Sequence, residues 1–279
     1  MRPISNKSRE FVMSIRYQLR TIYVGYTEDI RNIYVGYSSI KAMKLKVIAY
    51  ARNGFSQKFG IPRQSREDSC IETHIIFAPA YRVREALRGI EDYSHLWLLW
   101  GFHETIRQKG NEAQCEELDW SPTVRPPRLG GNKRMGVFAT RSPFRPNPIG
   151  LTSVKLLRVE ETANEGLALV VSGADLLDGT PIYDIKPYLA FSDCRPETKS
   201  GFAEATKDYC LAVQIDEDML KHAIEQSCPW NALREILTQD PRPAYQTDSE
   251  RVYHLDYAGW GVDFRVDAAT VCVKNLFKK

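Results

Sequence analysis

Short runs in which hydrophobic and polar residues alternate recur along the first two thirds of the chain. Between residues 71 and 77, one set of alternate positions is Ile71, Thr73, Ile75 and Phe77, and the polar residues Glu72 and His74 lie between them. This pattern is typical of a strand with one face toward water. The run from His95 to Phe102 is almost wholly apolar and rich in aromatics, so we expect a strand buried on both faces. Further strands are expected at residues 44–49, 135–140, 151–159, 167–172 and 182–186.

The pattern changes after a polar stretch at residues 192–209 that has no clear period and is typical of a linker. Residues 217–226 and 231–238 have helical character, and strands are expected at 251–257, 262–266 and 270–273. We therefore predict a mainly β chain, with a closed or nearly closed β-barrel domain at residues 43–195. A small α+β domain at residues 205–279 is expected to follow it.

Residues 1–42 look unlike the rest of the chain. The segment Arg20-Thr-Ile-Tyr-Val-Gly-Tyr is echoed by Arg31-Asn-Ile-Tyr-Val-Gly-Tyr, and two copies are too few to build a repeat fold. We expect an N-terminal extension outside the domain, with Met43 as the start of the domain, and assign it no function.

Composition narrows the class of protein. Hydrophobic content of 43% and charged content of 26% are those of a soluble globular protein. No apolar run approaches the roughly 20 residues that cross a membrane. The six cysteines are scattered without a C-x-x-C pair, which favours neither a metal site nor a disulfide framework. A cytoplasmic protein without metal or membrane contacts is expected.

The charge of the chain is concentrated in one stretch. No acidic residue lies between Trp120 and Val159, although the whole chain carries a formal charge of only +3. Prolines make Pro143-Phe-Arg-Pro-Asn-Pro148 incompatible with a helix or a central strand. A stiff cationic loop can hold an anion or a nucleotide, whereas the alternative is a solvated loop between strands. The cations are Arg125, Arg128, Lys133, Arg134, Arg141, Arg145, Lys155 and Arg158.

Residue patterns for common enzyme classes are absent from the sequence. There is no G-x-G-x-x-G and no phosphate-binding loop, and Ser142 lacks the turn of a hydrolase nucleophile. His95 and His103 would share one face of a continuous strand. A cluster of acids at Asp175, Asp178 and Asp184 allows two interpretations, capping of turns or hydrogen bonding to a ribose or amino group.

Several long motifs in order resemble one family. They are YSHLWLLWGFHE, VRPPRLGGNKRMGVFATRSPFRPNPIGL, GADLLDGTPIYDIKPYL and DPRPAY. From Met43 to its end the chain resembles the TsaA/TrmO family of tRNA methyltransferases. The resemblance implies that the barrel is the catalytic domain and binds S-adenosylmethionine. It also implies methylation of N6 of threonylcarbamoyl-adenosine, beside the anticodon of threonine tRNA, by a homodimer with the cofactor site near the subunit interface.

Matching to the family's motifs assigns the cofactor contacts, and the position of Glu104 is often glutamine in relatives. By motif match, cofactor contacts would come from Pro62, Arg63, Gln64, His103, Glu104, Arg141, Leu151, Leu177, Asp178, Gly179 and Thr180.

The other roles are hypotheses from the residues themselves. The clustering of acids suggests that Asp184 or Tyr183 takes the proton from the nitrogen nucleophile. Phe144 would stack on an unpaired anticodon-loop base or, alternatively, plug the loop. Phosphates would be neutralised by Arg125, Arg128, Lys133, Arg134 and Arg145.

Two alternatives stay open at this point. One is a non-catalytic RNA-binding barrel that keeps the scaffold and ignores the cofactor. The other is a methyltransferase for a different tRNA base or a different tRNA. The loop Asp240-Pro-Arg-Pro-Ala-Tyr245 is expected to help dock the substrate, or else to be a plain linker between elements.

Overall fold

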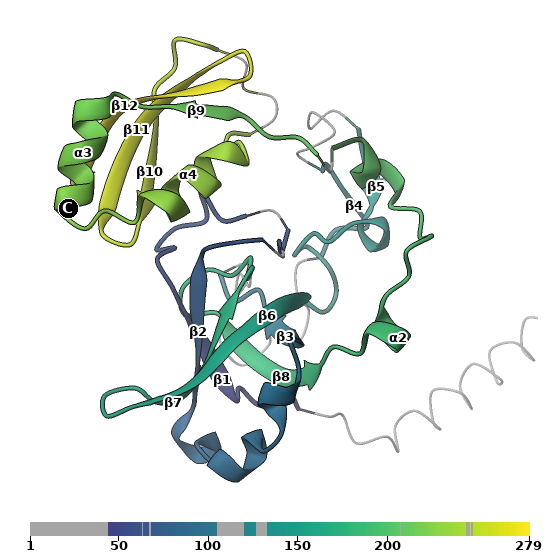
Figure 1. The fold of residues 1–279 in the computed structure, drawn as a ribbon. Helices are drawn as coiled ribbons and strands as arrows, with labels where there is room; N and C mark the ends of the chain where they lie inside the picture. The colour runs from purple at the N-terminus through teal and green to yellow at the C-terminus, as the bar shows by residue number, and fades with distance from the viewer. Residues whose placement is uncertain are drawn as a thin grey trace, which may run out of the picture. The chain divides into compact units, whose positions relative to one another are not determined.

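The computed structural model describes most of residues 44–279 (Figure 1). Outside the described part lie residues 1–43, Arg63, Glu67, 105–119, 127–132, Lys207, Ala244, Tyr245 and Thr247. The predicted extension therefore lies outside it too. Among the helices that the structure describes, none is long and apolar enough to span a membrane. Residues 46–279 form one compact unit.

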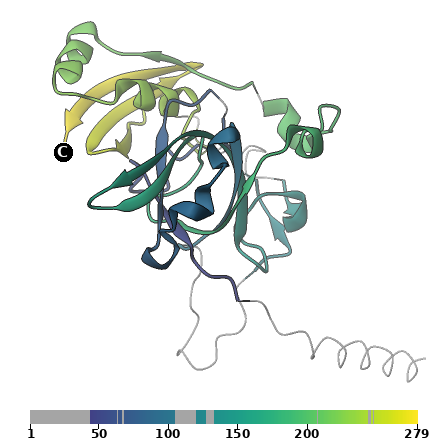
Figure 2. The ribbon, with the colours of Figure 1, turned by 60° about the horizontal axis from the view of Figure 1, so that its bottom comes forward.

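Six antiparallel strands form a closed barrel in the order β1-β2-β7-β6-β3-β8 (Figures 1 and 2). The ring closes through a short pairing of β1 with β8, at Ala49 with Ile182 and Tyr50 with Pro181. The predicted mainly β fold is confirmed. The strands are β1 (Ala49–Arg52), β2 (Glu72–Phe77), β3 (His95–Gly101), β6 (Ile149–Thr162), β7 (Gly166–Ser172) and β8 (Pro181–Pro187).

Strand β3 shows how the barrel core forms. Leu96, Leu98 and Trp100 are buried inside the barrel, whereas Trp97 and Leu99 are only half-buried. The prediction that this strand is buried on both faces is wrong, because an antiparallel barrel packs only its inner face on the core.

The same strand ends earlier than the sequence indicates. Gly101 is its last residue, and the His103 N–H donates back to the Gly101 carbonyl at 2.9 Å, which turns the chain. His95 and His103 therefore do not share a strand face, contrary to prediction.

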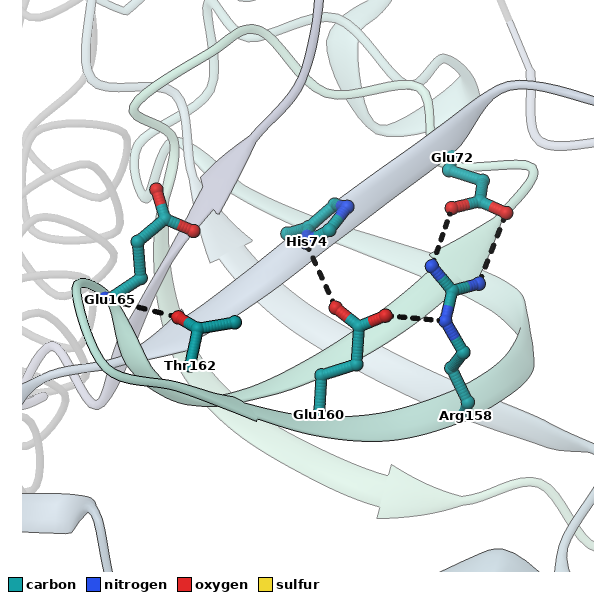
Figure 3. A network of polar contacts seen from close by, with 6 residues as sticks. All are labelled: Glu72, His74, Arg158, Glu160, Thr162 and Glu165. Atoms are coloured by element: carbon teal, nitrogen blue, oxygen red, sulfur yellow. Dashed lines mark hydrogen bonds and ion pairs between the residues drawn. The ribbon is translucent and has the colours of Figure 1, made fainter.

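Strand β7 is buried on both faces for a different reason, which Figure 3 illustrates. Its outward Val170 lies between His74 of β2 and Arg158 of β6 in the ladder. Arg158 reaches across β7 to both carboxylate oxygens of Glu72, at 3.1 and 3.0 Å, and also bonds Glu160 at 2.5 Å. The bond from Arg158 lowers the pKa of Glu72. A polar network thus covers the outer face of an apolar strand.

Two predicted strands are displaced or shortened. The strand expected at 44–49 starts only at Ala49, because the ladder with β2 and β8 runs through residues 49–52, while Leu45 stays exposed. The strand expected at 135–140 is reduced to β5 (Met135–Gly136), paired with β4 (Thr123–Val124). It gives way to the 3-10 helix η5 (Val137–Ala139). Other short helices are η1 (Pro79–Tyr81), η2 (Arg84–Leu87), η3 (Ile90–Asp92), α2 (Ala190–Asp193) and η6 (Gly201–Thr206).

The C-terminal region is an α+β structure, as predicted, with a four-stranded sheet in the order β10-β11-β12-β9. Asp216 caps α3 by accepting bonds from the N–H groups of Asp218 and Met219. Strand β9 was not predicted, because three residues are too few to show a period; it pairs in parallel with β12. The elements are β9 (Ala212–Gln214), α3 (Glu217–Glu225), α4 (Trp230–Thr238), β10 (Tyr253–Tyr257), β11 (Trp260–Asp267) and β12 (Thr270–Lys278).

The core of this C-terminal region includes side chains from far upstream in the chain. Phe55 and Ile71, in the connection between β1 and β2, are fully or almost fully buried in it. The Phe55 ring lies 5.0 Å from that of Tyr257, centroid to centroid. Leu177, just before β8, packs against the same core. The two regions of the chain therefore share one hydrophobic cluster.

Candidate active site

The cationic segment, the acid-free stretch at residues 120–159, is ordered internally by backbone hydrogen bonds. Val137 N–H donates to the Pro122 carbonyl at 3.0 Å, and Ser121 N–H donates to the Phe144 carbonyl at 3.1 Å. As predicted, residues 143–148 form neither helix nor strand. Val137 is buried, so its side chain is shielded from solvent although most of the segment is not.

Where this segment meets the rest of the barrel, a chain of polar contacts enters the core. Trp100 Nε1 donates to Thr152 Oγ1 at 3.0 Å, and that hydroxyl donates to Asp175 Oδ1 at 2.7 Å. Burial raises the pKa of Asp175, while the Thr152 bond and the nearby Arg141 charge oppose that rise. Arg141 Nη1 in turn donates to Gln64 Oε1 at 2.7 Å. Three segments distant in sequence therefore converge here, and Gln64 and Arg141 are both predicted cofactor contacts.

The Leu177–Thr180 turn makes a separate set of bonds. Asp178 Oδ1 accepts from Asn53 N–H at 3.0 Å and Oδ2 accepts from Arg52 Nη1 at 3.1 Å. The turn itself is closed by Thr180, whose N–H and hydroxyl both donate to the Leu177 carbonyl, at 3.2 and 2.7 Å. The Asp178 carboxylate therefore ties the turn to the end of β1 rather than capping it. Gly179 has a φ of 77°, and no atom of the described residues lies within 4 Å of the position that a Cβ would take, so there is open space beside its backbone.

Four other predicted cofactor contacts are half-buried or exposed. Pro62 is half-buried and lines a small hollow beside α4. His103 is half-buried, and the Glu104 carboxylate pairs with Lys58 Nζ at 3.2 Å. Leu151 lies on the outer face of β6 with 54% of its surface exposed. A fifth, Arg63, lies outside the described residues.

The two predicted catalytic residues are neighbours on β8. Asp184 Oδ1 accepts from the N–H of Ile185 at 3.0 Å, and Oδ2 pairs with Lys186 Nζ at 3.0 Å. The Tyr183 ring lies against Gly101, where a Cβ would come within 2.3 Å of the phenol oxygen. A glycine at this position therefore lets the tyrosine pack over the end of β3.

The predicted RNA contacts that the structure describes lie on or near the surface. Arg134 Nε donates to Thr123 Oγ1 at 2.9 Å, which ties it to β4. Phe144 is 51% exposed, so the prediction of a hydrophobic plug is not favoured. Arg125 and Lys133 are exposed and Arg145 is half-buried, while Arg128 lies outside the described residues.

A hollow of about 1450 Å³ opens between the cationic segment and the C-terminal region. On its C-terminal side, Arg242 makes a two-bond ion pair with Asp240 at 2.8 and 3.0 Å, and Tyr209 donates to the same carboxylate. Burial opposes ionisation of Asp240, but the bonds from Arg242 outweigh it and keep the pKa of that carboxyl below its ordinary value. On the barrel side the hollow is lined by Gln64, Arg66, Phe138 and Arg141.

Sequence reasoning did not find this hollow or the Trp100–Thr152–Asp175 chain. Thr152 is a signal that could have indicated the second, because it is a polar residue at an inward position of β6, beside the buried Val154. The hollow depends on loops that no periodicity describes.

Comparison with known proteins supports the family that the sequence motifs indicate. The chain matches the tRNA-methyltransferase O N-terminal domain over residues 50–194 and the TrmO C-terminal domain over residues 199–279. It is 41% identical to the tRNA (adenine(37)-N6)-methyltransferase of Escherichia coli (strain K12) over 233 residues, covering 81% of this chain and 93% of that enzyme.

Two further similarities concern the structure and the cofactor. The crystal structure of TrmO from P. aeruginosa has a TM-score of 0.65 and 30% identity, covering 86% of this chain and 99% of that one. A Pyrococcus abyssi protein named as a probable S-adenosyl-L-methionine-binding protein is 32% identical over 157 residues, 56% of this chain and 74% of that protein. Because both domains match and nearly the whole length of the E. coli enzyme is covered, the chain belongs to the tRNA-methyltransferase O family.

Proposed function

We propose that this protein transfers a methyl group from S-adenosylmethionine to N6 of threonylcarbamoyl-adenosine beside the anticodon of threonine tRNA. The observation that carries the proposal is the match of both family domains, together with 41% identity to an enzyme named for methylation of adenine 37 at N6. The convergence of Gln64, Arg141 and Asp175 supports it, since Arg141 and Asp175 belong to two separate family motifs and Gln64 is a predicted cofactor contact.

The residues present fit a cofactor of this charge and shape. Arg141 offers a guanidinium that matches a carboxylate, and Asp178, about a third exposed, offers an acceptor for a ribose hydroxyl or an ammonium group. Gly179 leaves its backbone open to close approach. The predicted contacts Pro62, Arg63, Gln64, His103, Glu104, Leu151, Leu177 and Thr180 complete the proposed set.

When bound, the cofactor supplies an electrophilic methyl group on a sulfonium. The chain's own task is to position the nitrogen in line, exclude water and accept the proton that this nitrogen loses. Asp184 is proposed for the proton, with Tyr183 as the alternative. The Asp184 carboxylate is 44% exposed, so a substrate can reach it.

Substitution of Asp184 by asparagine tests this role. The Asp184→Asn variant should bind cofactor and tRNA as the wild type does, yet methylate about 100-fold more slowly or worse, because a positioned base contributes at least that factor. Asp92→Asn removes an exposed carboxyl on η3 and is the matched control. A normal rate for Asp184→Asn would exclude Asp184 and leave Tyr183.

Assembly as a homodimer with the cofactor site near the interface is part of the proposal. Leu151 supports it, because its apolar side chain is more than half exposed in a single subunit. Leu151 is also an expected cofactor contact, and a second subunit near the cofactor site would cover it. Sedimentation velocity should give twice the mass of 31.9 kDa. A monomer at micromolar concentration would contradict the dimer.

The non-catalytic alternative is separated from this proposal by calorimetry. The enzyme should bind S-adenosylmethionine in the absence of RNA, whereas an RNA-binding barrel should bind RNA and ignore the cofactor. Absence of heat with the cofactor, in a protein that still binds tRNA, would therefore favour the alternative.

A further inference from the structure

Two aromatic side chains on the cationic segment are exposed to an unusual degree. Phe138 is 74% exposed and Trp120 is 46% exposed. Their rings stack on each other with centroids 6.4 Å apart and planes 28° apart. A pair of large rings that faces solvent together marks an interaction site more often than a single exposed residue does.

Hydrogen bonds order the backbone that carries both aromatic residues in the free protein. Phe138 occupies the middle of η5, whose first residue, Val137, is buried. Thr140 closes this helix, since both its N–H and its hydroxyl donate to the Val137 carbonyl, at 3.1 and 2.8 Å. On the other side, the Ser121 hydroxyl donates to the Thr123 carbonyl at 2.7 Å and orders the chain beside Trp120. A preorganised aromatic surface loses little conformational entropy on binding.

The charges around the pair indicate what it binds. Arg134 is tied to Thr123, and Arg125 and Lys133 are exposed on the same two-stranded hairpin. The sequence has no acidic residue from Trp120 to Val159. A second copy of this chain, placed on the pair by two-fold symmetry, would bring these cations against themselves. The favoured occupant is therefore anionic and has flat faces of its own.

We propose that Trp120 and Phe138 form a stacking surface for one unpaired base of the RNA substrate, an inference that rests on the proposed function. Unpaired bases stack on aromatic side chains, while the flanking phosphates are neutralised by nearby cations. Phe138 also lines the large hollow, together with Arg141 and Gln64. A nucleotide stacked at Phe138 is thus directed toward the residues proposed to hold the cofactor.

The experiment measures binding of a fluorescein-labelled anticodon stem-loop RNA to the full chain by anisotropy, without cofactor. Phe138→Ala should weaken binding about 5- to 100-fold, the range expected for loss of one base–aromatic stack. Phe138→Trp, which keeps a ring, should restore affinity. The matched control is Phe191→Ala, which removes a ring that is 87% exposed on α2, outside the cationic segment.

Two readouts separate stacking from a general disturbance of the loop. The slope of log affinity against log salt should be unchanged in Phe138→Ala, but should fall by about 0.7 in Arg134→Ala, which loses one phosphate contact. With an abasic site at the stacked loop position, wild type and Phe138→Ala should bind equally well.

Wild-type affinity in both Phe138→Ala and Trp120→Ala would overturn the inference. It would also be overturned if Phe138→Ala still bound more weakly than wild type whichever loop position carried the abasic site. A change from dimer to monomer in these variants, with RNA affinity unchanged, would assign the pair to a second subunit and also overturn it. If RNA binds through the pair but is never methylated, the proposed function fails while the inference stands.

Discussion

Replacement of Phe55 by alanine tests whether the barrel and the C-terminal region unfold as one cooperative unit. Phe55 belongs to the connection between β1 and β2, yet its side chain is fully buried in the core of the C-terminal region, against Tyr257. Its backbone N–H donates to Asn53 Oδ1, and its carbonyl accepts from Asp178 N–H. Alanine keeps both backbone bonds, so the substitution removes only the ring.

The magnitude follows from the buried surface. A phenylalanine buries at least about 150 Å² of apolar surface, which at about 25 cal/mol per Å² corresponds to about 4 kcal/mol. Measured losses of stability on replacing a buried phenylalanine by alanine are about 3–5 kcal/mol, because the surrounding side chains relax only partly and leave a cavity. We therefore expect Phe55→Ala to lower the free energy of unfolding by about 3–5 kcal/mol.

Urea denaturation followed by tryptophan fluorescence and by circular dichroism is the assay. Because residues 46–279 form one compact unit with a shared cluster, both probes should report one transition, shifted to lower urea in the variant. Phe191→Ala, on an exposed ring, should stay within about 0.5 kcal/mol of wild type. A loss below about 1 kcal/mol for Phe55→Ala would refute the idea of a shared core.

Two further predictions concern single positions. In Gly150→Ala the new methyl group would lie 2.2 Å from Trp100, so the indole must move and lose its bond to Thr152; near-UV circular dichroism should change, and stability should fall by about 1–3 kcal/mol. An unchanged near-UV spectrum would contradict this. The hydrogen bond to Asp263 raises the pKa of His254. The stability that protonated His254 adds to the fold should therefore be complete below pH about 6.5 and be lost as the pH rises through the folded-state pKa. His254→Gln should therefore melt below wild type at pH 6 and together with it at pH 9; an equal gap at both would exclude the titration.

Local pattern predicts the barrel strands well where one face is wet. The alternation around Ile75 and Phe77 placed β2 correctly, and the helices at residues 217–226 and 231–238 were recognised from their period. The pattern fails where the environment is set by distant parts of the chain. His95–Phe102 reads as doubly buried, yet β3 is covered on one face only, while β7 is covered by an ion network that no local window contains.

The candidate site likewise has one part that the sequence predicts and another part that depends on distant regions of the chain. Its residue types were predicted from the family resemblance, and in the structure two of them, Gln64 and Arg141, are joined by a hydrogen bond. From the sequence, Asp178 could equally cap a turn or bind a ligand, whereas in the structure its carboxylate accepts bonds from Asn53 and Arg52 and so ties the turn to the end of β1. The large hollow and the shared core join residues more than a hundred positions apart, so no spacing in the sequence indicates them.

Transfer of a labelled methyl group from S-adenosylmethionine to threonine tRNA, prepared with and without the threonylcarbamoyl group, bears most directly on the proposed activity. Nucleoside mass analysis of the product should find one added methyl at N6 of the modified adenosine beside the anticodon, and none on the unmodified tRNA. Label on another base, equal label on both tRNAs, or no label from a protein that binds both cofactor and tRNA would contradict the proposal.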